Sequence, residues 1–455
     1  MIFNTWPWRH WAALYGAAPA LRLDDETVSW SALCERIDQL AAGFQAQGVS
    51  PGDGVALCAR NRPETVLAWL ALLQCGARVL PLNPRLPASL LGELLPGLTL
   101  SHCLNLETSE HHGLPALQLL MRDGYAEIAW QAQRFVSMTL TSGSTGLPKA
   151  AVHSASAHLA SAEGVLSLMP FSRQDCWLLS LPLFHVSGQG IFWRWLRAGG
   201  QMAISERALA DALVNCSHAS LVPTQLWRLL NDSCPLTLKS VLLGGAAIPA
   251  ALTEQAEQQG IRTFCGYGLT EFASTVCARE ANGGDDVGTP LPGRELRLVD
   301  GEIWLRANSM AAGYWREGQL VPLVNAQGWF ATRDRGEMCD GKLRVIGRLD
   351  NLFFSGGEGI QPEDVERVIV QHPAVSQVFI VPVDDAEFGQ RPVAVVDADA
   401  TIDFSVLADW AKDRLAGFQQ PCRWLFLPDA MKGTGIKVSR LQLAQWVCTQ
   451  SNGEK

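Results

Sequence analysis

The segment Thr141–Lys149 concentrates hydroxyl groups, glycines and one lysine in a short stretch of chain. The glycines let the backbone turn its N–H groups inward, the hydroxyls add rotatable donors, and the lysine adds a mobile positive charge. Such a loop can wrap a polyphosphate, although the same residues also suit a polar surface loop between two strands. Because Ala150 follows the lysine, the P-loop spacing G-x-x-x-x-G-K-[ST] is absent, and a P-loop kinase or GTPase is disfavoured.

Alternating strands and helices must hold this loop in place. The apolar residues 135–140 predict a strand that runs directly into it. Apolar residues at helical spacing predict a helix over 33–44 that Gly48 ends, then a strand over 55–58. A second helix starts after Pro63 and runs to about Gln74. Because this alternation continues past residue 241, we expect an α/β fold with largely buried strands.

The character of the sequence changes near residue 350, where a turn-rich stretch begins. A helix opened by Pro362, strands over 378–383 and 393–396, and helices near 404–415 and 439–448 follow. We therefore predict a large N-terminal domain, residues 1–349, in which mixed sheets are packed with helices. A small, mobile α+β domain should span residues 350–455, a usual domain size.

Composition excludes several classes of protein. Of 455 residues, 48% are hydrophobic and 18% charged, and the net charge of −9 comes without a basic cluster that could follow a nucleic-acid backbone or an anionic membrane. The 12 cysteines form no CxxC pair, which disfavours zinc and favours reduced thiols. The N-terminus lacks the pattern of a signal peptide, and the apolar run 66–73 is too short to cross a bilayer. We expect a cytoplasmic protein without membrane insertion, and a homo-oligomer stays open.

Thr141–Lys149 is similar to the signature loop of the adenylate-forming superfamily, which includes acyl-CoA synthetases, stand-alone adenylation domains and luciferases. Further motifs of the superfamily follow in the same order over almost the whole chain, at residues 181–188, 244–246, 266–271 and 332–334, at Arg348 and Asp350, and at Lys437 followed by Arg440. This ordered set is far more specific than any one loop, and by it the chain is identified as a member of the superfamily.

The resemblance implies substrates and a residue set. ATP and Mg²⁺ would be bound, with the nucleotide held by Thr141, Ser142, Gly143, Ser144, Thr145, Gly146, Lys149, Gly244, Gly245, Ala246, Tyr267, Asp334 and Arg348. Thr270 would contact the α-phosphate, Glu271 would bind the magnesium ion, and Lys437 would be the catalytic lysine. These roles make chemical sense, because a carboxylate attacking the α-phosphorus of ATP needs positive charge between two anions. A lysine on a mobile domain can supply that charge once the substrates are bound.

Within the superfamily, the chain is similar to the o-succinylbenzoate–CoA ligase family of menaquinone (vitamin K2) biosynthesis. Four segments carry this similarity: residues 6–11, 185–195, 221–230 and 347–358. The resemblance implies that 2-succinylbenzoate and ATP give an acyl-adenylate and pyrophosphate. The small domain would then rotate about Asp350, and the thiol of coenzyme A would displace AMP. Gly356 and Gly357 would border the coenzyme A channel.

A dicarboxylate substrate needs a polar or positive anchor for the carboxylate that does not react. His185 would line the acyl tunnel, and the other candidates for the acyl site are Ser187, Gly188, Gln189, Arg194, Thr224 and Gly268. Arg194 could instead lie on the outer face of its helix, since the neighbouring Trp193 and Trp195 could equally be core residues.

The sequence departs from the superfamily at two places. Arg333 stands where T-G-D has glycine, which leaves Asp334 in register, and Ile436 precedes Lys437 where glycine is common. Lys432 therefore competes for the catalytic role, although the spacing K-x-x-R favours Lys437.

Three other functions stay open. The chain could be a ligase for another aryl or short-chain acid. It could also be an adenylation enzyme that loads a carrier protein, although nothing after residue 440 suits a fused carrier domain. A nucleotide-binding regulator without catalysis is disfavoured, because mere binding does not need Lys437.

Overall fold

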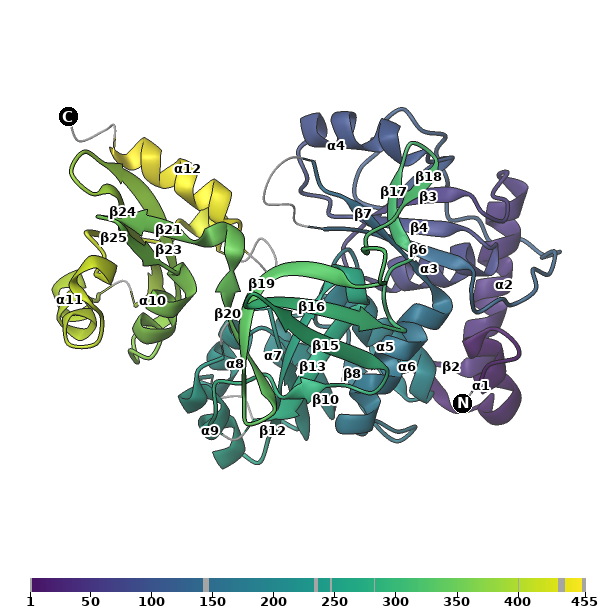
Figure 1. Cartoon of the computed structure of the whole chain (residues 1–455). Helices are drawn as coiled ribbons and strands as arrows, with labels where there is room; N and C mark the ends of the chain where they lie inside the picture. Colours follow the sequence, from purple (N-terminus) through teal and green to yellow (C-terminus); the bar gives the residue numbers. More distant parts are fainter. Residues whose placement is uncertain are drawn as a thin grey trace.

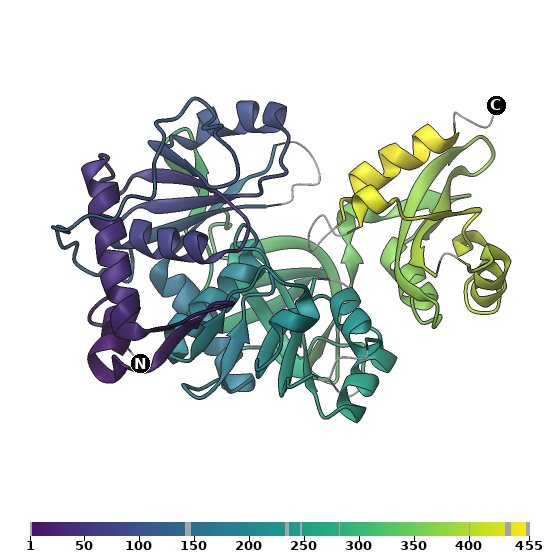
Figure 2. The ribbon, with the colours of Figure 1, turned by 180° about the vertical axis from the view of Figure 1, so that it is seen from behind.

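The computed structural model describes residues 2–141, 147–232, 236–245, 248–281, 283–399, 401–432 and 438–451. A large body carries the N-terminus and a smaller one carries the C-terminus (Figure 1), and the view from behind shows the same division (Figure 2). Within these described residues, the large body contains three sheets and the small body one.

The first sheet carries the Thr141–Lys149 segment. It has seven strands in the order β18-β17-β7-β6-β4-β3-β5, with parallel pairs around β3 and β4 and antiparallel pairs from β6 to β18. Its strands are β3 (Gly54–Cys58), β4 (Arg78–Leu82), β5 (His102–Asn105), β6 (Phe135–Leu140), β7 (Ala150–Ser154), β17 (Gly313–Arg316) and β18 (Gln319–Val321). All residues of β3 and β4 are buried, which confirms the prediction of buried strands.

The second sheet has nine strands in the order β14-β13-β12-β11-β10-β8-β9-β1-β2. These are β1 (Pro19–Arg22), β2 (Thr27–Ser29), β8 (Cys176–Leu178), β9 (Gln201–Ala203), β10 (His218–Leu221), β11 (Ser240–Leu243), β12 (Arg262–Leu269), β13 (Ser274–Glu280) and β14 (Thr289–Pro290). A third, antiparallel sheet follows in the chain, with β15 (Arg294–Val299), β16 (Glu302–Ala307), β19 (Phe330–Cys339) and β20 (Lys342–Arg348).

Helices join the two larger sheets into one core. A single buried cluster takes side chains from β3 and β4, from β8 and β9, and from the helices between them, including Trp69, Phe192 and Trp195. The helices of the large body are α1 (Pro7–Tyr15), α2 (Trp30–Ala46), α3 (Pro63–Gln74), α4 (Ala88–Leu94), α5 (Ala155–Leu168), α6 (Val186–Ala198), α7 (Leu209–Ala212), α8 (Pro223–Leu230) and α9 (Ala250–Gln258).

The small body starts where the chain leaves β20. A 3₁₀ turn, Leu349–Asn351, leads into a sheet formed by β21 (Phe353–Ser355), β22 (Glu358–Ile360), β23 (Val375–Asp385), β24 (Gly389–Ala398) and β25 (Arg423–Phe426). Its helices are α10 (Pro362–Ile369), α11 (Phe404–Lys412) and α12 (Arg440–Ser451). The mixed α/β class with a large N-terminal and a small C-terminal part is confirmed. A domain boundary at 349/350 agrees with this change of sheet and stays a proposal.

Several predicted elements are found with nearly the predicted bounds. Helix α3 begins at Pro63 and ends at Gln74, because proline suits the first position of a helix. Strand β6 spans the predicted residues 135–140. No helix in the described part of the chain is both long and apolar enough to cross a bilayer.

Candidate active site

The Thr141–Lys149 segment connects two antiparallel neighbours, β6 and β7. The Thr141 N–H donates to the Lys149 carbonyl at 2.8 Å and so closes the base of the loop. Lys149 is exposed, and its Nζ lies 5.1 Å from the centre of the Tyr314 ring. Ser142, Gly143, Ser144, Thr145 and Gly146 lie outside the described residues, so their part in phosphate binding stays a prediction.

Tyr267, Asp334 and Arg348 form one hydrogen-bonded group, although three different strands carry them. The Tyr267 hydroxyl donates to Asp334 Oδ2 at 2.6 Å. Asp334 and Arg348 are cross-strand partners in β19 and β20, and Arg348 Nη1 donates to Asp334 Oδ1 at 3.1 Å. Burial and the neighbouring Asp334 carboxylate raise the pKa of Tyr267, so its phenol stays a proton donor. The structure thus brings together three residues that the sequence assigns to adenosine binding.

The turn after β11 lies against the strand that carries Tyr267. A Cβ on Gly244 would lie 3.4 Å from the carbonyl oxygen of Gly266, one residue before Tyr267. Gly245 has a φ of +86°, which glycine adopts without strain. Gly244 and Gly245 are therefore placed beside Tyr267, as an adenine-binding turn requires, whereas Ala246 lies outside the described residues.

Thr270 and Glu271 lie in a 3₁₀ turn, Thr270–Phe272, at the end of β12. The Tyr314 hydroxyl donates to Glu271 Oε1 at 2.7 Å, and the Ala311 N–H donates to the Glu271 carbonyl at 2.7 Å. Within the described residues no donor reaches Glu271 Oε2. The carboxylate is thus fixed through Oε1, and Oε2 has no hydrogen-bond donor among the described residues.

This arrangement fits a magnesium ion shared with a nucleotide. Mg²⁺ takes oxygen ligands, usually one or two protein carboxylates together with phosphate oxygens and water. The described residues contain no group of three or more His, Cys, Asp or Glu side chains that could hold a metal alone. Glu271 and Lys149 both contact Tyr314. Glu271 would therefore supply one ligand to the ion, and the phosphates of the nucleotide would supply others.

Helix α6 positions the candidate acyl residues. His185 caps its N-terminus, and burial lowers the pKa of His185, which favours a neutral imidazole. Gly188 is required by packing, since a Cβ there would lie 2.2 Å from the Pro182 carbonyl oxygen. Gln189 Nε2 donates to Thr139 Oγ1 at 3.0 Å and to the Leu183 carbonyl at 3.1 Å. Because both amide protons are used inside the protein, Gln189 is placed to orient the helix start.

Arg194 is a buried cation on the same helix, with 1% of its surface exposed. Nη2 donates to Ser220 Oγ at 3.1 Å, and the guanidinium carbon lies 4.6 Å from the centre of a Trp177 ring. Burial lowers the pKa of Arg194 to about 9. The possibility that this side chain lies on an outer face of the helix is wrong, because residues 188–196 are all buried.

The remaining acyl candidates lie on neighbouring elements. Ser187 and Thr224 are half-buried at the starts of α6 and α8. A Cβ on Gly268 would lie 2.0 Å from the carbonyl oxygen of Ser274 in β13. A Cβ on Gly190 would lie 3.1 Å from Ser274 Oγ and 3.2 Å from Arg194 Nη1. The guanidinium and the start of β13 therefore both border Gly190, and β13 pairs there with the Gly268 end of β12.

Known proteins share this arrangement. A family model described as AMP-binding enzyme matches residues 8–315, and one described as AMP-binding enzyme C-terminal domain matches residues 364–435. The first model alone covers more than half of the chain. The chain belongs to the AMP-binding enzyme family.

Relatives and solved structures within this family narrow the assignment. The 2-succinylbenzoate–CoA ligase of Salmonella typhimurium is 66% identical over 450 residues, which cover 98% of this chain and 99% of that protein. An arginine-to-lysine variant of E. coli MenE with bound OSB-AMS has a TM-score of 0.95 and 63% identity, covering 98% of this chain and 99% of that one. MenE from Bacillus subtilis in complex with ATP and magnesium ion has a TM-score of 0.86 and 27% identity, covering 96% and 99%. The chain therefore groups with the 2-succinylbenzoate–CoA ligases of the AMP-binding enzyme family.

The segment between the two bodies of this AMP-binding enzyme is held by ion pairs. Asp350 accepts from Arg333 Nε at 2.9 Å and from Arg348 Nη2 at 3.2 Å. Arg333 has a φ of +61°, a left-handed conformation that costs a residue with a side chain about 1–2 kcal/mol. Arginine thus occupies a conformation that suits the glycine common in this family, and its side chain contacts the predicted hinge residue.

Gly356 and Gly357 form the two-residue turn between β21 and β22, with φ of +57° and +86°. Positive φ at both positions is typical of a type I′ hairpin turn and favours glycine. A structural reason for both glycines is therefore present, and their contact with coenzyme A stays a prediction.

Lys437 lies outside the described residues, so its catalytic role is untested. Its competitor Lys432 is engaged elsewhere, because its Nζ lies 3.1 Å from Asp397 Oδ1 and 3.2 Å from Asp429 Oδ1. Those hydrogen bonds raise the pKa of Lys432. Lys432 would have to leave both carboxylates before it could reach a substrate.

Tyr314 was missed by the sequence reasoning. Its signal was weak but present, because Tyr314 is one of only four tyrosines and directly follows a glycine, as Tyr267 does. Its contact with Glu271 spans 43 positions of chain and depends on the pairing of β17 with β7, which no local pattern predicts.

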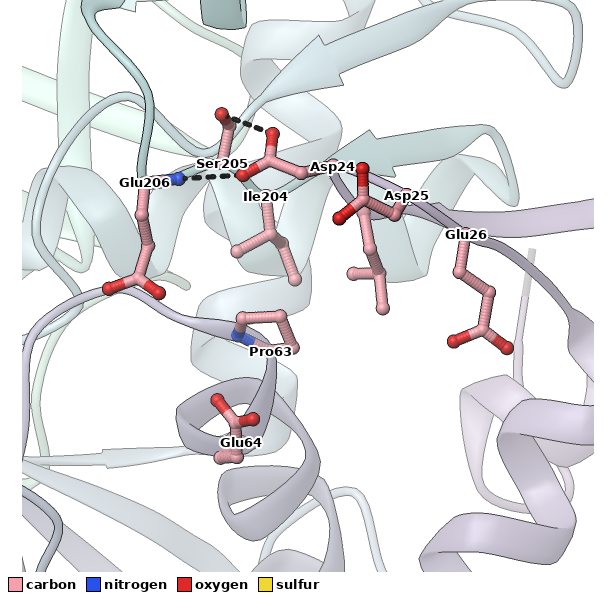
Figure 3. A pocket seen from close by; sticks show the side chains of 9 residues that line it. Asp24, Asp25, Glu26, Pro63, Glu64, Ile204, Ser205 and Glu206 are labelled. Atoms are coloured by element: carbon pink, nitrogen blue, oxygen red, sulfur yellow. Dashed lines mark hydrogen bonds between the residues drawn. The ribbon is translucent and has the colours of Figure 1, made fainter.

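A cavity of about 310 Å³ shares no residue with this site. Figure 3 shows its acidic lining, with Asp24, Asp25 and Glu26 on one side and Glu64 and Glu206 on the others. Carboxylates in such number disfavour ATP, coenzyme A or a dicarboxylate, which are all anions.

Proposed function

We propose that this chain ligates 2-succinylbenzoate to coenzyme A through an acyl-adenylate, giving 2-succinylbenzoyl-CoA, AMP and pyrophosphate, in menaquinone biosynthesis. The observation that carries the choice of acid is Arg194. A fully buried cation on the helix that follows His185 suits a substrate with a second, unreacted carboxylate. The high identity to a named 2-succinylbenzoate–CoA ligase supports the same choice.

In the first step, a carboxylate oxygen of the succinyl group bonds to the α-phosphorus of ATP and the bond to pyrophosphate breaks. Lys437 would lie between the two anions and stabilise the charge that develops. A bound magnesium ion would neutralise phosphate charge, held by Glu271. Thr270, at the start of the same turn, would donate to the α-phosphate.

The nucleotide would be held by the groups described above. The ring of Tyr267 and the turn at Gly244 and Gly245 would enclose adenine, with Ala246 beside them. Asp334 would accept from the ribose hydroxyls, and Arg348 orients that carboxylate through its hydrogen bond. Backbone and hydroxyl donors of 141–146, together with Lys149, would bind the departing pyrophosphate.

The acyl group would lie between α6, α8 and the end of β12. Arg194 would bind the aromatic carboxylate, His185 would line the tunnel, and Ser187 and Thr224 would add hydroxyl contacts. Gly188, Gln189 and Gly268 would shape the wall, because each packs against protein groups of its own.

In the second step the thiol of coenzyme A bonds to the carbonyl carbon and AMP leaves. We propose that the domains are residues 1–349 and 350–455, that Asp350 is the hinge, and that Gly356 and Gly357 border the coenzyme A channel. We also propose a cytoplasmic location, since the cysteines described in the structure are free thiols, as a reducing compartment favours.

ATP–pyrophosphate exchange over a panel of aromatic and aliphatic acids tests the substrate. We expect the fastest exchange with 2-succinylbenzoate, and faster exchange with another acid would overturn the choice. Lys437→Ala should slow adenylation by about 10³-fold while preformed acyl-adenylate still reacts with coenzyme A. Lys432→Ala is the matched control, and a larger loss in that variant would move the catalytic role to Lys432.

A further inference from the structure

Tyr314 lies where two parts of the nucleotide site meet. It belongs to β17, which pairs antiparallel with β7 (Figure 1). In this pairing Tyr314 is the cross-strand partner of Ala151. Ala151 is two residues beyond Lys149. The strand therefore places Tyr314 beside the end of the phosphate loop, although the two are far apart in the sequence.

The Tyr314 hydroxyl acts on Glu271. It donates to Glu271 Oε1 at 2.7 Å, and Ala311, three residues earlier, donates its N–H to the Glu271 carbonyl at 2.7 Å. One segment thus fixes both the backbone and the carboxylate of Glu271.

The Tyr314 ring acts on Lys149. The lysine Nζ lies 5.1 Å from the ring centre, within the range of a cation–π contact. One side chain thus contacts a carboxylate through its hydroxyl and an ammonium group through its ring. The carboxylate suits a divalent cation and the ammonium suits phosphate, so both groups would act on a single triphosphate.

We propose that Tyr314 is a positioning residue that holds Glu271 and Lys149 in a fixed relation, so that the metal ion and the phosphates bind as one unit. The proposal rests on the proposed function, since it takes Glu271 as the metal ligand and Lys149 as a phosphate ligand. Tyr314 touches neither substrate nor metal in this role.

Two substitutions separate the hydroxyl from the ring. Tyr314→Phe removes the hydrogen bond to Glu271 and keeps the ring, and Tyr314→Leu removes both. Trp315→Phe is the matched control, because Trp315 is the next residue of the same strand and its ring contacts Arg78, with the guanidinium carbon 3.9 Å from the ring centre.

The experiment measures the binding of ATP and of Mn²⁺ to each variant in the absence of any carboxylic acid substrate. Electron paramagnetic resonance gives the affinity of Mn²⁺ for the enzyme–ATP complex, and titration calorimetry gives the affinity for metal-free ATP. For Tyr314→Phe we expect Mn²⁺ affinity to fall about tenfold with metal-free ATP affinity unchanged, as for loss of one hydrogen bond to a charged group. Tyr314→Leu should also weaken metal-free ATP by about 2–5-fold. Trp315→Phe should change neither.

A double-mutant cycle tests whether Tyr314 acts through Glu271. In the Glu271→Gln background, Tyr314→Phe should cause no further loss of Mn²⁺ affinity. A full tenfold loss in that background, or unchanged Mn²⁺ affinity in Tyr314→Phe alone, would overturn the proposal. If the unsubstituted enzyme does not bind Mn²⁺ together with ATP, the proposed nucleotide site itself is wrong. If it binds both but reacts faster with another acid, only the proposed acid substrate is wrong.

Discussion

The acyl side and the hinge side of this enzyme handle charge in opposite ways. On the acyl side, Arg194 is buried and contacts a hydroxyl and an aromatic ring, and no carboxylate pairs with it in the described part of the chain. On the hinge side, Asp334, Arg348, Asp350 and Arg333 form a continuous series of ion pairs, and the two arginine side chains are 38% and 63% exposed. Arg194 on the proposed acyl side therefore has no carboxylate partner among the described residues, whereas the charges on the proposed hinge side pair with one another. This difference suggests that the acid is selected by charge and the nucleotide by hydrogen bonds.

The largest expected effect comes from removing the unpaired cation. Arg194→Met should lower kcat/KM for 2-succinylbenzoate by about 10²–10³-fold, as for truncating one partner of a buried charge pair. The same substitution should raise the free energy of unfolding of the empty enzyme by about 1 kcal/mol, because a costly buried charge is lost. Pyrophosphate exchange and urea denaturation measure the two effects. Arg194→Lys, which keeps the charge, is the control, and a less stable methionine variant would make Arg194 structural.

The pH dependence of stability should separate the buried core beside Arg194 from the hinge side. His153 of β7 packs against His158, with the ring centres 5.0 Å apart, and the His158 ring stacks on Trp193 of α6. Burial lowers the pKa of His153 to about 4 from 6.5, so between these values the unfolded chain binds a proton that the folded chain does not. Stability should therefore fall as pH drops from 6.5, by about 2 kcal/mol at pH 5 and about 3 kcal/mol at pH 4. Urea denaturation of the protein and of His153→Gln measures this loss, and equal slopes in both would contradict it.

The contribution of the hinge side to the free energy of unfolding should change only at lower pH. Burial alone would raise the pKa of Asp350, but hydrogen bonds from Arg333 and Arg348 hold it below 3.8. Its stabilising contribution is thus present above pH 3.8 and is lost as pH falls further.

Asp334→Asn should moderately weaken the use of ATP and leave the use of the acid largely unchanged. The amide keeps the shape but loses the charge that pairs with Arg348 and accepts from Tyr267. We expect the KM for ATP to rise about 10–100-fold with a smaller change in the KM for 2-succinylbenzoate. Initial rates with each substrate varied in turn measure this. Equal changes in both KM values would mean that the two sides are not separate.

The smallest effect should appear at Arg333. Arg333→Ala and Arg333→Gly both remove the ion pair with Asp350, but only glycine adopts the φ of +61° without strain. The glycine variant should be more stable than the alanine variant by about 0.5–1 kcal/mol in urea denaturation. Arg228, whose exposed side chain pairs with Asp397 across the two bodies at 3.4 Å, offers an Arg228→Ala control for loss of an ion pair without a change of backbone strain. If the alanine variant were more stable than the glycine variant, backbone strain at residue 333 would be contradicted.

The sequence predicts these features unevenly, for physical reasons. Helix α3 was predictable because Pro63 marks its start locally and the apolar residues after it continue almost to Gln74. The motif residues Tyr267, Asp334 and Arg348 were predictable because each belongs to a resembling segment, and the structure joins them. The burial of Arg194 was not predictable, because α6 is buried on every side and shows no polar face to orient it. Lys437 and most of the phosphate loop stay predictions.

The small body is attached to the large one through the backbone of β20. Gln361 Nε2 donates to the Arg348 carbonyl at 3.0 Å, and Arg367 Nη2 donates to the Val345 carbonyl at 3.2 Å. A rotation at the proposed hinge residue Asp350 would therefore exchange hydrogen bonds on the strand whose Arg348 orients Asp334, the proposed ribose ligand. Nucleotide affinity and body orientation would then be linked, and such linkage is reciprocal. The factor by which a bound nucleotide favours one orientation is the factor by which that orientation tightens the nucleotide.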